Sequence, residues 1–219
     1  KLGLNLLFTF DDGYKDNAVI ALPLLIKYDI SAIFFLTTSY IGTDKWLFHD
    51  RIRYLICNGV LDECTTEKQL RKLNQGLDID PSMYEIANEQ FPASSPGRIM
   101  MDWTEVNSII KAGFHVGTHT VSHANLSQIN EEDQRKEIQQ SIEVIFSATG
   151  MRCDTIAYPN GLFGKNTLEL LPKLGLTYGF TTENGINKKN TNHKLLKRIG
   201  VNPSDSIPLL TLKLFLQTL

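Results

Sequence analysis

Two short clusters of side chains have the types and spacing that metal chemistry needs. Asp11 and Asp12 stand side by side directly after an apolar run, and His119 and His123 lie four residues apart. Two imidazoles and one carboxylate make a three-ligand set with open positions, which is typical of a catalytic rather than a structural metal site. Adjacent side chains on an extended backbone point apart, so the second aspartate is free for another role, such as that of a base.

The two histidines are expected to share an ion, because side chains four residues apart meet on one face of a helical turn. Gly117 is expected to let the backbone turn tightly out of the preceding strand. The metalloprotease motif is excluded, since Thr120 stands where that motif has a glutamate. Taken singly, each cluster is also explained by solvated surface side chains. With only five histidines in the chain, it is the combination that favours a metal centre.

These clusters need elements that bring them to one edge of a sheet. Apolar runs of strand length alternate with segments of helical spacing, which predicts strand–helix repeats and a parallel sheet. Roughly six or seven such units fit, which favours a closed or nearly closed barrel over a flat sheet. Asp102 and Glu105 form a capping-box pattern at one helix start. The predicted strands are 4–10, 31–36, 114–116, 155–157, 177–180 and 195–200, and the predicted helices are 16–28, 102–111, 131–148, 166–174 and one from about 204.

The strand–helix repeat is interrupted between about residues 43 and 100. This stretch is polar and helical in character, and a loop rich in proline, serine and glycine ends it. We interpret it as a helical insertion over one end of the sheet, within a single domain that spans residues 1–219.

Composition limits the classes of partner and the cellular compartments that suit this chain. A net charge of −2 gives no basic field for nucleic acid or for an anionic membrane. The apolar stretch 207–219 is interrupted by polar residues and is shorter than the roughly 20 residues of a membrane span, and no signal peptide is visible. The chain starts at Lys1 without an initiator methionine, so we expect a trimmed N-terminus and leave the compartment open. An odd number of cysteines excludes a dense disulfide framework and favours a reducing, cytoplasmic compartment: Cys57, Cys64 and Cys153.

Three motifs resemble, in the same order, the first three motifs of polysaccharide deacetylases, that is, carbohydrate esterase family 4 with its NodB-like domain. They are residues 9–13 (TFDDG), 119–123 (HTVSH) and 156–161 (IAYPNG). The resemblance runs from about residue 4 to residue 202 and is weakest in the insertion. It implies a distorted (β/α)7 barrel, related to the TIM barrel, and hydrolysis of N-acetyl groups on the amino sugars of a polysaccharide.

Carried over by motif, the resemblance implies that Asp12, His119 and His123 hold one divalent metal ion and that Asp11 is the general base. Zinc is the expected metal, and cobalt, nickel, manganese or iron also suit such a ligand set. The backbone N–H of Asn160 is expected to help hold the oxyanion of the reaction.

The third motif departs from the family pattern, because Ala157 stands where the family often has an arginine that orients the base. Arg198 is our candidate replacement, with an exposed or structurally paired arginine as the alternative. The AlaTyrPro form of this motif is similar to relatives linked to surface-polysaccharide or O-antigen pathways. Candidate contacts to a carbohydrate substrate are Tyr158, Pro159 and Trp46, and core packing is the alternative for Trp46.

The proton donor for the leaving amine stays open. The family's late motif supplies a histidine, but no histidine follows His193, which lies in a polar loop stretch. The donor is therefore absent, lies upstream of Lys1, or is replaced by His49 from the insertion.

Two other functions compete with N-deacetylation. One is a different metal-dependent amide hydrolase on the same scaffold. The other is a non-catalytic carbohydrate-binding protein that keeps the metal, which the missing late histidine favours. Asp11 argues against it, because a binding module needs no base beside the ion.

Overall fold

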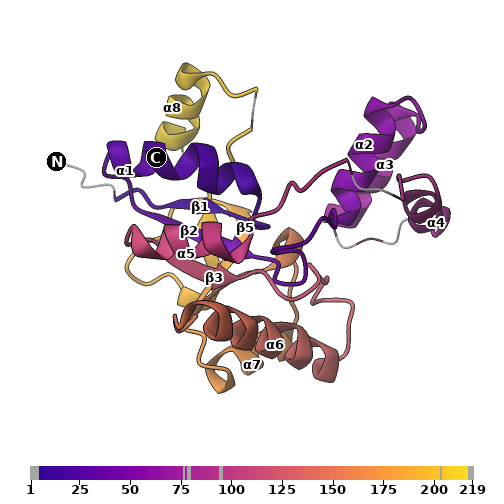
Figure 1. Ribbon diagram of the computed structural model, residues 1–219. Coiled ribbons are helices and arrows are strands. Elements are labelled where there is room, and N and C mark those ends of the chain that lie inside the picture. The colour runs from indigo at the N-terminus through magenta and orange to yellow at the C-terminus, as the bar shows by residue number, and fades with distance from the viewer. Residues whose placement is uncertain (1–4, 76, 78–79, 94–95, 203, 217–219) are drawn as a thin grey trace.

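Six parallel strands form a single sheet in the computed structural model, which describes residues 5–75, 77, 80–93, 96–202 and 204–216. Their spatial order follows the chain (Figure 1). The sheet curls, so that Arg198 on the last strand reaches Thr9 on the first, with 3.2 Å between Nη1 and Oγ1. The predicted distorted barrel is confirmed, with six strands within the described ranges. These are β1 Phe8–Phe10, β2 Ala32–Leu36, β3 His115–Thr118, β4 Thr155–Ala157, β5 Tyr178–Asn184 and β6 Leu196–Arg198.

Helices connect successive strands and cover the outside of the curled sheet (Figure 1). The capping box predicted at Asp102 is confirmed: its carboxylate accepts from the backbone N–H of Glu105 at 2.9 Å, and the Glu105 carboxylate accepts from the Asp102 N–H at 2.8 Å. The predicted helix 16–28 begins as a π-helix. The bounds are η1 Asn17–Ala21, α1 Leu22–Lys27, α5 Trp103–Lys111, α6 Glu131–Thr149, η2 Pro159–Gly161, α7 Lys165–Lys173, η3 His193–Leu195 and α8 Ile207–Leu216.

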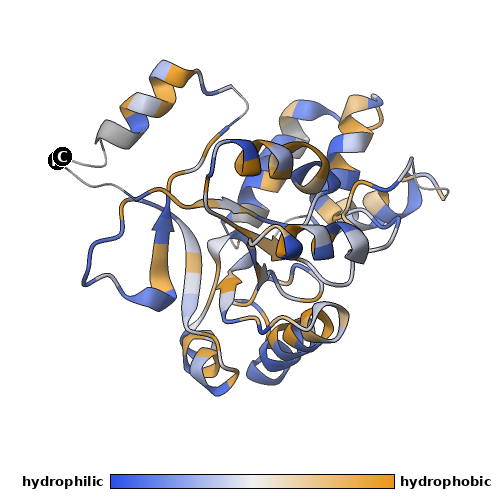
Figure 2. Ribbon diagram, turned by 60° about the vertical axis from the view of Figure 1, so that its left-hand side comes forward, coloured by the Kyte–Doolittle hydropathy of each residue, from blue (hydrophilic) through white to orange (hydrophobic). Residues whose placement is uncertain are grey.

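The main core lies between the sheet and these helices, and all of β2 is buried. Figure 2 shows this as apolar strands at the centre of the molecule. Phe34 of β2 stacks on Phe10 with 5.0 Å between ring centroids. The prediction that Gly117 turns the chain is wrong, because this residue lies inside β3. A Cβ there would come within 2.5 Å of the Phe35 ring and of Thr155 Oγ1, so close packing requires the glycine.

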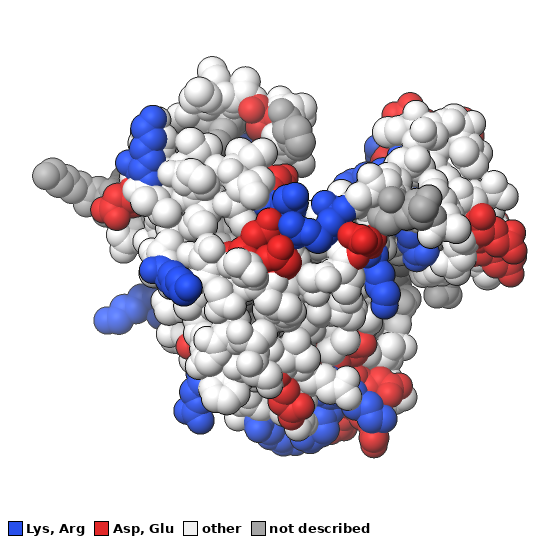
Figure 3. Space-filling view, in the orientation of Figure 1, with Lys and Arg blue, Asp and Glu red and all other residues white. Residues whose placement is uncertain are grey.

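The insertion between β2 and α5 folds into three helices, α2 Phe48–Cys57, α3 Glu63–Asn74 and α4 Ser82–Glu89, as its helical character predicted. They share a small hydrophobic cluster of their own that includes Ile52 and Met83. Figure 3 shows an open notch between these helices and the barrel, with acidic and basic side chains along its edge. Among the described helices, none has the length and apolar character that a bilayer crossing requires.

The returning end of the insertion pairs with the loop after β1. Tyr14 forms an isolated antiparallel bridge with Met100, and the N–H of Met101 donates to the carbonyl of Gly13 at 2.8 Å. The insertion is therefore attached at the aspartate cluster, next to the carboxyl end of the sheet.

Candidate metal centre

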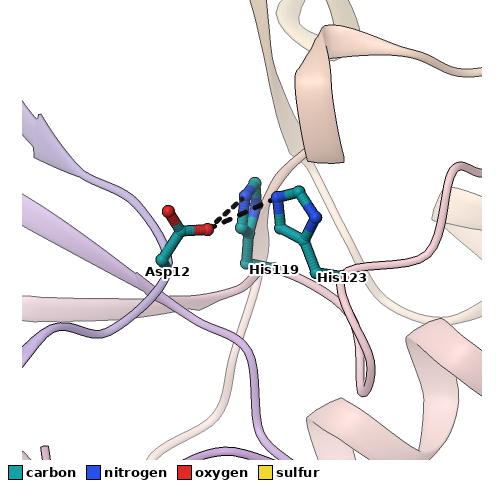
Figure 4. Close-up of side chains that lie close together, drawn as sticks. All are labelled: Asp12, His119 and His123. Atoms are coloured by element: carbon teal, nitrogen blue, oxygen red, sulfur yellow. Dashed lines mark ion pairs between the residues drawn. The ribbon is translucent and has the colours of Figure 1, made fainter. Parts of the chain in front are cut away.

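The structure brings together Asp12, His119 and His123, which come from the loops after β1 and β3. The Oδ1 atom of Asp12 lies 3.4 Å from the Nε2 atom of each histidine (Figure 4). In the parallel sheet, β1 and β3 both flank β2, so their carboxyl ends open onto the same edge. The topology thus joins two motifs that are more than a hundred residues apart in the sequence.

The three candidate ligand atoms are spaced for binding a metal ion rather than for hydrogen bonding to one another. A distance of 3.4 Å is long for an N–H···O hydrogen bond. The buried Oδ1 atom of Asp12 has no hydrogen-bond partner among the described residues. In contrast, a tetrahedral site with bonds of 2.0–2.1 Å separates its ligand atoms by about 3.4 Å. Asp12 Oδ1 therefore lies at ligand spacing from both histidine nitrogens, and the three ligand atoms all lie within 4.8 Å of one another.

A backbone contact also fixes the buried ring of His119. Its Nδ1 atom lies 2.7 Å from the carbonyl oxygen of Ala157, which can only accept. The Nδ1–H proton is thereby assigned, and the lone pair of Nε2 faces Asp12. Carbonyl partners of this kind orient metal-bound histidines.

Burial and mutual charge shift the pKa values of all three groups. Burial alone would raise the pKa of Asp12, but the facing histidine rings outweigh it and hold that pKa below its usual range. Burial would lower the pKa of His119, but the contact with Asp12 raises it overall. Burial and the neighbouring His119 lower the pKa of His123 to about 4, so its ring is neutral at pH 7 and can bind metal.

The ligand loops have unusual backbone geometry. Asp12, Thr120 and His123 have φ values of 71°, 67° and 62°, in the left-handed region that L-residues rarely adopt. The helical turn predicted between His119 and His123 is therefore wrong, since this segment is an irregular loop. Its backbone N–H groups bond to side chains of other elements instead of forming a helix. Strained residues of this kind cluster at functional sites.

Arg198 pairs with Asp11, as proposed from the sequence. Its two terminal nitrogens bond the two carboxylate oxygens of Asp11 at 2.7 and 2.8 Å. Its Nε–H donates to the carbonyl of Thr181 at 2.8 Å, which anchors the guanidinium to β5. Asp11 and Asp12 thus point to different partners.

The other predicted site residues differ in their burial and in the groups that they contact. Asn160 follows β4 with φ 56° and is half-buried. Tyr158 and Pro159 are buried, and the Tyr158 hydroxyl donates to the carbonyl of Lys194 at 2.8 Å. Trp46 packs in the insertion against Tyr54 and Phe91, and its indole N–H donates to the carbonyl of Gly97. The substrate contacts expected of Tyr158, Pro159 and Trp46 stay predictions.

The insertion adds a further group beside Asp12. His49, near the start of α2, has its Nε2 atom 3.9 Å from Asp12 Oδ2 and 2.8 Å from the Tyr14 hydroxyl. That hydroxyl donates to Asp50 Oδ2 at 2.8 Å. Burial is the main cause that raises the pKa values of Tyr14 and Asp50. Sequence reasoning missed Tyr14 and Asp50, because only the folded insertion brings α2 to the aspartate loop.

His115 and His193 lie at exposed positions, at the start of β3 and in η3. From the sequence, His193 and His49 were considered for the role of proton donor. Of these two, His49 lies at the candidate metal centre.

Comparison with known proteins agrees with this geometry. The sequence profile described as "Polysaccharide deacetylase" matches residues 5–179, so the chain belongs to the polysaccharide deacetylase family. It is 24% identical, over 200 residues, to the putative polysaccharide deacetylase YxkH of Bacillus subtilis. That match covers 91% of this chain and 52% of the relative, so the chain spans about half the length of the curated relative that it matches.

Solved structures share the fold. The deacetylase PplD of Streptococcus pyogenes, in complex with acetate, matches with a TM-score of 0.64 and 20% identity over 94% of this chain and 68% of PplD. IcaB from Ammonifex degensii matches with a TM-score of 0.65 and 21% identity over 94% of this chain and 71% of IcaB. At these identities the likeness extends to the fold, and the chemistry must be argued from the residues.

Proposed function

We propose that this chain hydrolyses N-acetyl groups on the amino sugars of a polysaccharide and that it needs one divalent metal ion. The observation that carries the proposal is the pair of 3.4 Å distances from Asp12 to His119 and His123, with the pair of Asp11 and Arg198 beside them. Three ligands with open positions are typical of catalytic sites. Family membership supports the reaction and the substrate class.

A metal ion at Asp12, His119 and His123 would lower the pKa of water and polarise the acetamide carbonyl. We expect Asp11 to take the proton of the attacking water on a carboxylate oxygen. Arg198 donates to both oxygens of that carboxylate and so holds it in a fixed plane. The backbone N–H of Asn160 is proposed to donate to the oxyanion that forms from the acetyl carbonyl.

The C–N bond breaks when the amine nitrogen receives a proton, and the products are acetate and a free amino sugar. His49 is our proposed donor of this proton. Its ring lies beside the metal ligands, with Nε2 3.9 Å from Asp12 Oδ2 and the ring centroid 5.6 Å from that of His123. Tyr14 and Asp50 orient that ring. Zinc is the proposed metal, and the link to a surface-polysaccharide or O-antigen pathway stays a prediction.

The test is acetate release from N-acetylated chito-oligosaccharides and from N-acetylglucosamine polymers, by zinc-loaded wild type and by Asp11→Asn. Asp154→Asn is the matched control, because Asp154 is an exposed aspartate that precedes β4. We expect acetate from the wild type and the control, and at least a hundredfold less from Asp11→Asn. A zinc-loaded wild type that releases no acetate would refute the deacetylase and favour a carbohydrate-binding role or a different amide substrate.

A further inference from the structure

We propose that Glu137, on α6, is the positioning residue that holds the loop between His119 and His123 in its metal-binding shape. The inference rests on the metal centre of the proposed function and extends it to a helix that contributes no ligand. It predicts that the loop is preorganised before any metal binds.

The Glu137 carboxylate receives three hydrogen bonds from this loop. Its Oε2 atom accepts from the backbone N–H groups of Val121 and Ser122, at 3.0 and 2.9 Å. Its Oε1 atom accepts from the Ser122 hydroxyl at 2.8 Å. The N–H of Val121 also lies 3.1 Å from the backbone carbonyl oxygen of Glu137. All these partners lie between the two histidines in the sequence, so one carboxylate fixes the middle of the loop.

The loop needs such an anchor because its own backbone does not favour this shape. Thr120 and His123 have φ values of 67° and 62°, and the segment has no helical or strand hydrogen bonds of its own. Residues in this region persist only where the surroundings determine them. A carboxylate that accepts two adjacent N–H groups suits such a turn, because charge-assisted hydrogen bonds are stronger than neutral ones.

The opposite side of the loop is held by the segment after β2. There the N–H groups of Thr38 and Ser39 donate to the carbonyls of Thr120 and Val121, at 3.2 and 2.9 Å. The loop is thus fixed between the carboxyl end of β2 and one face of α6.

Ser141 reinforces the same helix face one turn further on. It accepts a buried hydrogen bond of 2.6 Å from the Thr118 hydroxyl, whose oxygen in turn accepts from the Thr120 N–H at 3.1 Å. Glu137 and Ser141 are four residues apart and lie on one face of α6. The helix therefore holds both the start and the middle of the ligand loop.

Loss of the Glu137 carboxylate leaves the Val121 and Ser122 N–H groups without this acceptor and lets the loop relax. Metal binding must then order the loop, which lowers affinity. Outer-shell partners of metal ligands typically contribute about 10–100-fold to affinity, so we expect an effect of that size. A glutamine can replace the glutamate, since its carbonyl oxygen accepts from the two N–H groups while its NH₂ donates to the Ser122 hydroxyl.

The experiment measures zinc affinity of the full chain by competition with a chromophoric chelator, for Glu137→Ala, Glu137→Gln and the control Glu143→Ala. Glu143 is an exposed glutamate on the same helix, and it bonds Gln139 rather than the loop. We expect roughly 10–100-fold weaker binding for Glu137→Ala, binding within a few-fold of wild type for Glu137→Gln, and no change for the control. Wild-type affinity in Glu137→Ala would overturn the proposal, as would equal losses in Glu137→Ala and Glu143→Ala.

Thermal unfolding of the metal-free variants separates positioning from folding. If Glu137→Ala does not fold, Ser122→Ala replaces it, because that change removes only the hydroxyl hydrogen bond and must still weaken zinc binding. The readout is affinity, so a wild type that binds zinc but releases no acetate refutes the proposed function and leaves this inference intact. A wild type that binds no zinc overturns both.

Discussion

Replacing Arg198 by methionine tests how the base is oriented. The change removes both hydrogen bonds to Asp11, at 2.7 and 2.8 Å, and leaves an unbranched apolar side chain that ends where Nε of the arginine lies. Hydrogen bonds to charged groups contribute about 1.5–3 kcal/mol each. The pair is partly open to solvent, with side-chain exposures of 16% and 28%, so the lower end of that range applies. Two such bonds give about 3 kcal/mol, which corresponds to a factor of roughly 100 in rate.

The assay is steady-state acetate release by zinc-loaded protein, with kcat and KM determined separately. We expect kcat to fall about a hundredfold in Arg198→Met, because Arg198 acts on the base and not on the zinc ligands. Arg198→Lys should be intermediate, since an ammonium keeps the charge but cannot bind both oxygens in one plane. Arg152→Met, at an exposed arginine, is the control. Unchanged kcat in a zinc-loaded Arg198→Met protein would refute the role of the pair.

Three further predictions concern the core, the proton donor and the metal. Gly117→Ala should destabilise the fold by about 1–3 kcal/mol in denaturant unfolding, since its Cβ would overlap Phe35 and Thr155, whereas Gly200→Ala should be near neutral because nothing lies within 4 Å of its Cβ. His49→Gln should lower kcat by roughly 10²–10⁴-fold with zinc affinity changed by only a few-fold, and a fully active variant would exclude His49 as donor. Apparent zinc affinity should fall as the pH is lowered through the pKa of His119, which burial alone would lower but the contact with Asp12 raises above its usual value, because a proton then competes for its Nε2 atom. A zinc titration that gives the same affinity at each pH would contradict this.

The strand–helix order and the two ligand motifs could be predicted from the sequence because they depend on local patterns. Buried strands are apolar runs, and the bounds of β4 were predicted to the residue. An aspartate after β1 and two histidines after β3 were expected because reactive groups gather at the carboxyl ends of parallel strands, and the choice of Asp12 over Asp11 as the ligand came from the family resemblance.

Tertiary contacts decide the features that the sequence did not reveal. The helical turn after His119 was wrong because Glu137 and the end of β2 hold the loop in another shape. Gly117 was assigned to a turn because the real reason for the glycine, the close approach of the Phe35 ring, exists only in the packed sheet and is not visible in the sequence. Arg198 lies 187 residues from Asp11, so spacing could not pair them, and the candidate came from family resemblance.

The metal stoichiometry of activity tests the central claim most directly. Metal-stripped wild type is titrated with zinc, and bound metal and acetate release are followed in the same samples, with Asp12→Ala and His123→Ala alongside. The account predicts that activity rises with bound zinc, reaches its plateau at one equivalent, and is lost together with tight binding in both variants. Full acetate release from metal-free protein, or stoichiometric tight binding and activity in Asp12→Ala, would contradict it.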